Sequence, residues 1–171
     1  MSAHVVKKAA DLDYRTPEEF LGRSTGYTGD DVVDEAVGAV QTGFRVARLE
    51  PGGSVDSHVH SFEESLYVIE GVLTIDTPEG TLELVAGDYG LLPVGSTHAY
   101  RNTSGEAVSF SEVKAPLPRA RFGYDTQFPP PLAPTPARSE VFGPRDHRST
   151  RAPSRHGTGW PPRRATSTRW A

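Results

Sequence analysis

Short stretches in which apolar and polar residues alternate occupy most of the segment between residues 41 and 113. Alternation with a period of two is typical of strands that bury one face, and glycine- and proline-containing turns separate the stretches. The pattern predicts strands at residues 41–49, 57–60, 64–69, 72–76, 81–85, 89–92, 98–102 and 107–113. Eight short strands with regular turns predict an all-β barrel.

The rest of the chain shows weaker patterns. Thr16 and Pro17, followed by two glutamates, are typical of a helix start. Gly22 and the polar residues 24–31 limit this helix to a short one. We therefore divide the chain into an N-terminal extension (1–40), a barrel (41–115) and a proline- and arginine-rich linker and tail (116–171).

Charge separates the barrel from the tail. The chain has 18 basic and 22 acidic residues, and the segment from Pro129 onward holds eight and two of them, which leaves 10 basic and 20 acidic residues before it. The acidic excess before Pro129 argues against nucleic-acid binding by the barrel. The tail also holds nine of the fifteen prolines and few aliphatic residues, so we expect it to be disordered.

The composition excludes several further classes. The chain has no cysteine, which rules out disulfides and thiolate metal ligands. No apolar run approaches the roughly 18 residues that span a bilayer, and the first residues lack the pattern of a secretion signal. We expect a cytoplasmic protein that does not enter a membrane.

Four residues with metal-binding side chains carry the candidate chemistry. His58 and His60 are two residues apart, so on a strand both rings point to one face. A bend at residues 61–63 would return Glu64 towards them, and we expect His98 to approach from the opposite side of the closed sheet. Three imidazoles and one carboxylate suit divalent manganese, iron, nickel or zinc and leave two positions of an octahedral ion open.

Glu63 is the alternative to Glu64 as the carboxylate ligand. Leu66 and Val68 are apolar and in phase with Glu64. This phase favours Glu64 pointing into the barrel and Glu63 pointing out of it.

Two sequence motifs surround the four residues. Residues 52–71 read GGSVDSHVHSFEESLYVIEG, and residues 87–102 read GDYGLLPVGSTHAYRN. At every fixed position they resemble the two signature motifs of the cupin superfamily, over roughly residues 40–115. The resemblance implies a double-stranded β-helix, or jelly-roll barrel, with His58, His60, Glu64 and His98 as metal ligands.

The two segments are most similar to the N-terminal half of bacterial two-cupin proteins, which include ureidoglycine aminohydrolase-like and dioxygenase-like members. Here the proline-rich residues 128–136 lead into the tail, and no second His-x-His sequence follows. We therefore expect a homodimer that associates through barrel strands, since exposed strand edges are normally covered and two-fold dimers are the commonest oligomers.

Two further residues are candidate catalytic groups. Tyr100 is in phase with His98, so it either donates a hydrogen bond to a bound ligand or is an ordinary packed tyrosine. Phe110 and Glu112 share one face of the last strand. If that face is inward, Glu112 is a candidate acid or base; if it is outward, Glu112 is a solvated surface residue.

Three functional classes fit these observations. The first is a metal-dependent enzyme, dioxygenase-like before aminohydrolase or isomerase, that acts on a small anionic or chelating molecule. One glutamate against a divalent ion leaves a net positive charge, which suits such substrates. The second class is a barrel that binds a small ligand without turning it over, and the third is a structural remnant without activity.

Overall fold

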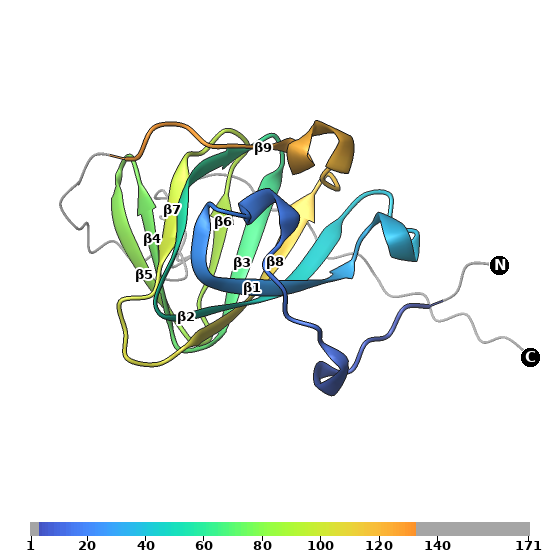
Figure 1. The fold of residues 1–171 in the computed structure, drawn as a ribbon, viewed down its shortest axis with the longest axis horizontal. Coiled ribbons are helices and arrows are strands. Elements are labelled where there is room, and N and C mark those ends of the chain that lie inside the picture. The colour runs from blue at the N-terminus through green and yellow to red at the C-terminus, as the bar shows by residue number, and fades with distance from the viewer. Residues whose placement is uncertain (1–3, 133–171) are drawn as a thin grey trace, which may run out of the picture. The chain divides into compact units, whose positions relative to one another are not determined.

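The computed structural model describes residues 4–132. Its strands form one antiparallel sheet that curls into a nearly closed barrel (Figure 1). The strands are β1 (Ser24–Val33), β2 (Gly43–His60), β3 (Glu63–Glu70), β4 (Val72–Thr77), β5 (Gly80–Val85), β6 (Tyr89–Leu92), β7 (His98–Arg101), β8 (Val108–Ala115) and β9 (Thr126–Gln127). The predicted all-β barrel is confirmed. The disordered tail was predicted from Pro129 onward, and all of it beyond residue 132 lies outside the described residues.

Strand β2 connects the two halves of the barrel. The sheet order is β5-β4-β7-β2-β8-β3-β6, and β1 and β9 also pair with β2. The prediction of two separate strands, 41–49 and 57–60, is wrong, because β2 is one strand that bends at Gly52 (φ 71°). Reciprocal 3.0 Å hydrogen bonds join the backbone at Gly52 and Gly53 to Asn102 and keep the strand paired through the bend.

Strand β1 was not among the predicted strands. The predicted short helix is only the 3-10 turn η2 (Glu18–Phe20), and residues 24–31, which we expected to do no more than end it, belong to β1. The polar segment is extended because it pairs with β2 along most of its length and buries Tyr27. Local propensity is thus overridden by tertiary pairing.

The other helices are short 3-10 turns: η1 (Ala9–Asp11), η3 (Glu35–Val37) and η4 (Ala120–Asp125). Within residues 4–132, no helix is long and apolar enough to cross a membrane.

The inward faces of the strands follow the predicted phase. Leu66 and Val68 are 2% and 0% exposed, Glu64 is buried beside them, and Glu63 is exposed. On β8, Phe110 and Glu112 are both buried. The alternative left open by the sequence is therefore decided, and Glu112 points inward.

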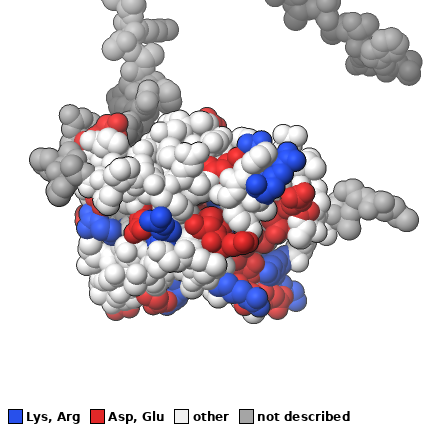
Figure 2. Space-filling view, turned by 45° about the horizontal axis from the view of Figure 1, so that its top comes forward, with Lys and Arg blue, Asp and Glu red and all other residues white. Residues whose placement is uncertain are grey.

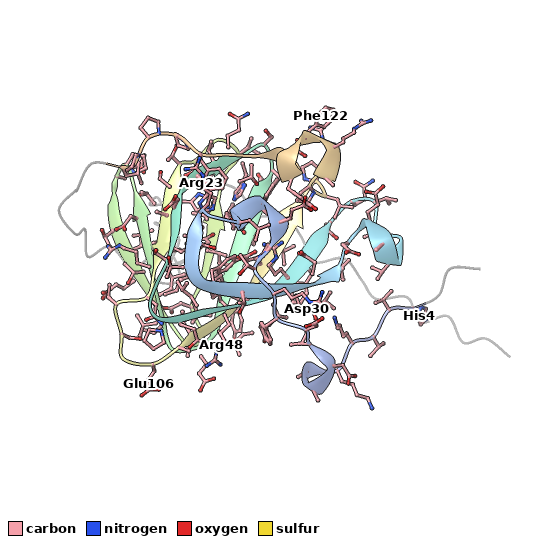
Figure 3. All side chains as sticks on the ribbon, in the orientation of Figure 1. His4, Arg23, Asp30, Arg48, Glu106 and Phe122 are labelled. Atoms are coloured by element: carbon pink, nitrogen blue, oxygen red, sulfur yellow. The ribbon has the colours of Figure 1, made fainter. Side chains whose placement is uncertain are left out.

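Residues 119–128, which we call the strap, pack on the barrel although the sequence placed them in the linker. Arg119 and Asp125 form an ion pair that closes η4, and β9 then pairs with Val59 and His60. Arg23, labelled in Figure 3, lies with its guanidinium carbon 5.0 Å from the centroid of the Phe128 ring. The strap therefore covers the end of β2.

Charged groups are unevenly distributed on the surface. Figure 2 shows a face on which acidic and basic side chains gather together, next to a broad area without charge. Mixed charge of this kind is typical of a surface stabilised by local ion pairs rather than one that attracts a polyanion.

The glycines of the two motifs occupy the bends of the chain. Gly52, Gly71, Gly87 and Gly95 all have positive φ angles. At Gly71 an added Cβ would lie 2.7 Å from the carbonyl oxygen of Ala107, whereas at Gly87 no atom lies within 4 Å of it. Gly71 is thus required for both its backbone conformation and the close approach of β8.

This difference predicts unequal costs for two alanine substitutions. Gly71→Ala should lower the free energy of unfolding by about 2–4 kcal/mol, because left-handed strain and a steric clash add up. Gly87→Ala, the control, should cost about 1–2 kcal/mol from strain alone. Urea denaturation measures both values, and equal losses would contradict the role given to the clash.

Candidate functional site

The four residues singled out by the sequence converge inside the barrel. His58 and His60 come from the end of β2, Glu64 from the start of β3 and His98 from the start of β7, and all four are buried. One nitrogen or oxygen atom of each lies within 4.8 Å of the corresponding atoms of the others.

The expected approach of His98 from the opposite side of the sheet is wrong. His98 is paired in register with His58 on the neighbouring strand, and their ring centroids are 4.1 Å apart. The reason is the length of β2, which continues past its bend and forms the strand next to β7.

Hydrogen bonds on the outer side of the rings set their orientation. His58 Nδ1 lies 2.7 Å from the carbonyl oxygen of Asp56, and His98 Nδ1 lies 2.9 Å from that of Ser96. A carbonyl only accepts, so Nδ1 of both rings carries a proton, and Nε2 is the ring nitrogen that faces the interior. His60 Nδ1 lies 3.0 Å from Thr126 Oγ1 in the strap.

The inner nitrogens face a common point. Among the described residues, Nε2 of His58 and of His98 has no hydrogen-bond partner although both atoms are buried. Glu64 Oε2 lies 3.3 Å from His60 Nε2 and 3.5 Å from His98 Nε2. Buried polar atoms without partners are costly, so the arrangement favours a ligand that satisfies them.

Aromatic side chains cover the cluster. The ring of Phe62 stacks on that of His60 at 4.2 Å between centroids, and the ring of Phe20 meets His58 edge-on at 5.1 Å. Both phenylalanines are buried. They keep the site in an environment of low polarity, which strengthens electrostatic interactions.

The pKa shifts of His58, His60 and Glu64 favour the ionisation states that bind a metal cation. Burial lowers the pKa of His58 well below its usual value and also lowers that of His60, so both rings are neutral near pH 7. Burial by itself would raise the pKa of Glu64, but the adjacent imidazoles of His60 and His98 lower it well below its usual value. Neutral imidazoles and an ionised carboxylate are the forms that coordinate metals.

The spacing also fits one ion. Ligand bonds of about 2.0–2.2 Å place neighbouring ligand atoms roughly 3–4 Å apart, close to the separations between Glu64 and the two histidines. The four residues could therefore hold one divalent metal.

Tyr100 contacts the cluster through Glu64. Its buried hydroxyl donates a 3.1 Å hydrogen bond to Glu64 Oε2. Burial, followed by the charge of Glu64, raises the pKa of Tyr100 well above its usual value. The hydroxyl therefore stays protonated and orients the carboxylate.

Glu112 accepts a hydrogen bond at one oxygen only. Its Oε1 accepts a 2.6 Å hydrogen bond from the hydroxyl of Tyr27, while Oε2 has no hydrogen-bond partner within the described part of the chain. Burial and then the charge of Glu64 raise the pKa of Glu112, against the opposing effects of Lys114 and Arg45. A buried carboxyl with a raised pKa is a candidate acid or base.

Sequence reasoning missed the charged network around Glu112. The guanidinium of Arg45 donates to Asp31 at 3.0 and 2.7 Å and to Glu19 at 2.9 Å, and its Nη1 lies 3.7 Å from Glu112. Lys114 is buried next to it. The sequence did contain an indication of this network. Arg45, Ala47 and Leu49 are two residues apart along β2 and point to the same buried face, so the charge of Arg45 requires a partner inside the barrel.

Comparisons with known proteins agree with this architecture. The model of the Cupin_2 family, described as a cupin domain, matches residues 45–114. Polyketide synthase CurC of Streptomyces cyaneus is 32% identical over 96 residues, and the match covers 54% of this chain and 62% of that protein. The chain thus spans less than two thirds of the length of this curated relative.

Solved structures show the same fold. The polyketide cyclase RemF of Streptomyces resistomycificus superposes with a TM-score of 0.61 at 23% identity, over 66% of this chain and 80% of RemF. A sugar phosphate isomerase of the cupin superfamily from Silicibacter pomeroyi superposes with a TM-score of 0.56 at 25% identity, over 65% of this chain and 75% of that one.

Fold and site together define a small β-barrel with a buried polar cluster at one end. The match of residues 45–114 to the cupin-domain model, together with the two motifs, supports a cupin superfamily assignment for this barrel, and the solved structures show the same fold.

The charged network leads to a prediction about stability. Arg45→Met should lower the free energy of unfolding by about 3–5 kcal/mol, because it leaves buried carboxylates without their cation. Arg48→Met is the matched control. Arg48, labelled in Figure 3, is half-exposed and pairs with Glu50, so its loss should cost no more than about 1 kcal/mol. Similar losses for the two variants in urea denaturation would show that the network is not stabilising.

Proposed function

We propose that this protein is a metal-dependent enzyme that acts on a small, oxygen-rich carbonyl compound of the polyketide type. The observation that supports it most is the pair of buried Nε2 atoms, on His58 and His98, that have no partner among the described residues. The similarity to polyketide synthase CurC supports the substrate type.

In this proposal His58, His60, Glu64 and His98 hold one divalent manganese, iron, nickel or zinc ion. When bound, the ion polarises a carbonyl or enol oxygen of a chelating substrate. Thr126 orients His60, and Tyr100 orients Glu64 rather than contacting the substrate, since its hydroxyl is donated to that carboxylate.

Glu112 is the proposed acid or base. Its Oε2 accepts no hydrogen bond from the described residues, and the nearest cationic nitrogens, those of Lys114 and Arg45, lie 3.5 and 3.7 Å from it. With a pKa raised by burial and by Glu64, the carboxyl can exchange a proton closer to neutral pH than an exposed glutamate can.

Dioxygenase chemistry is the second candidate. Three imidazoles and one carboxylate suit redox-active iron or manganese as well as zinc or nickel. The identity of the bound metal therefore separates the two candidates, because zinc supports Lewis-acid chemistry only.

The metal proposal predicts the metal content of purified protein. Protein prepared without added metal should contain one divalent ion per chain, and the double variant His58→Ala/His60→Ala should lose it because two nitrogen ligands are gone. His4→Ala is the control, since His4 is exposed. Elemental analysis by mass spectrometry measures all three proteins, and unchanged metal in the double variant would refute the assignment.

We also propose that the protein is a homodimer that associates through barrel strands. Strand β6 is the last strand of the sheet, and β3 and β6 expose Tyr67, Ile69, Tyr89 and Leu91 to solvent. Exposed apolar residues on an edge strand are typical of an interface.

Light scattering at micromolar concentration tests the dimer. The wild-type chain should have the mass of a dimer, and Tyr89→Glu should have that of a monomer because it places a charge in the apolar face. Phe122→Glu, on the strap (Figure 3), is the control and should remain a dimer. A monomeric wild-type protein would contradict the proposal, and a dimeric Tyr89→Glu variant would exclude this face.

A further inference from the structure

A second feature of the barrel is a cavity of about 460 Å³ near the start of β2 and the end of β8. Glu19, Asp31, Arg45 and Lys114 line it, together with residues of η3 and the strap. Its volume is within the roughly 300–1,000 Å³ of small-molecule sites. None of the four metal-ligand candidates lines this cavity.

Lys114 is a buried cation with unused hydrogen-bond donors. It is 5% exposed, and its nearest carboxylate oxygens are those of Glu112 at 3.5 Å, Glu19 at 3.9 Å and Asp31 at 4.0 Å. These distances exceed the roughly 2.7–3.2 Å of an N–H···O hydrogen bond. The carboxylates thus neutralise the ammonium but leave its N–H groups without a close acceptor among the described residues.

Arg45 lines the same cavity, but its hydrogen-bond donors have close acceptors within the protein. Its guanidinium donates hydrogen bonds of 2.7–3.0 Å to Asp31 and Glu19. Carboxylates of the protein therefore accept the hydrogen bonds of Arg45. Lys114 is the cation whose N–H groups can donate to an oxygen atom of a ligand.

The charge of the lining restricts the class of ligand. Glu19, Asp31, Asp34 and Glu35 face two cations, Arg45 and Lys114, which gives a formal excess of two negative charges. A phosphate dianion would be repelled in such a cavity. An uncharged carbonyl or hydroxyl oxygen meets no such repulsion and can accept from Lys114.

The position of Lys114 connects the cavity with the cluster of histidines. Lys114 and Glu64 are paired in register across β8 and β3, and both are buried. The two polar sites therefore lie on neighbouring strands at the same end of the barrel.

We infer that the cavity binds the uncharged, oxygen-rich part of the substrate and that Lys114 donates a hydrogen bond to one of its carbonyl or enol oxygens. The inference rests on the proposed function for its substrate class. It selects a polyketone or polyphenol and excludes a phosphorylated sugar.

The test uses 1,8-dihydroxyanthraquinone as the uncharged probe and glucose 6-phosphate as the charged one. Fluorescence quenching or calorimetry follows their binding to the full chain, both as purified and after treatment with a chelator. The anthraquinone should bind in both states, because Lys114 is a donor that requires no metal, and glucose 6-phosphate should bind at least tenfold more weakly.

Lys114→Met should weaken anthraquinone binding by roughly ten- to a hundredfold, because it removes a charged donor and keeps the length of the side chain. Lys8→Met, at an exposed lysine, is the control. Ala36→Trp is a second variant that leaves the charged network intact. Ala36 is exposed at the rim of the cavity, so the indole should obstruct the cavity without affecting folding, which thermal unfolding verifies.

The outcomes separate the two proposals. Unchanged anthraquinone binding in Lys114→Met and in folded Ala36→Trp would overturn the inference, as would tighter binding of glucose 6-phosphate that depends on Lys114. Protein that contains no metal but still binds the anthraquinone through Lys114 would refute the proposed metal centre and leave the cavity assignment in place.

Discussion

The hydrogen bonds on the outer side of the imidazole rings are the constraint on which the site depends. Backbone carbonyls of Asp56 and Ser96 hold the Nδ1 atoms of His58 and His98, so the Nε2 atoms must point into the barrel. Each carbonyl is two residues before its histidine. A local feature of the chain thus determines the tautomer and, with it, the ability to bind a cation.

The ring of His60 is held by a side chain rather than by a backbone carbonyl. His60 contacts Thr126, which belongs to the strap and is 66 residues away in the sequence. The strap is in turn anchored by the hydrogen bond from Tyr124 to Glu18 and by the edge-on contact between the rings of Phe128 and Phe20. The environment of this ring therefore depends on both ends of the described chain.

A network of charged side chains around Arg45 lies beside the cluster of histidines and positions other groups. Arg45 joins η2, β1 and β8 by ion pairs to Glu19, Asp31 and Glu112. Removing one member of such a buried network leaves its partners as uncompensated charges, so the charged groups hold one another in place. Here they place Glu112 and Lys114 next to the metal-ligand candidates, where each has an atom left to interact with a ligand.

The sequence alone determined the barrel, the four clustered residues and the inward phase of Glu64, Leu66 and Tyr100. These follow from a period of two along each strand and from motif spacing, which are local properties. Only the tertiary structure decided that residues 24–33 form a strand, that β2 is continuous, that Thr126 contacts His60 and that Lys114 lies beside Glu112. Each of these depends on pairing or burial between segments far apart in the chain, where contact with distant groups overrides local preference.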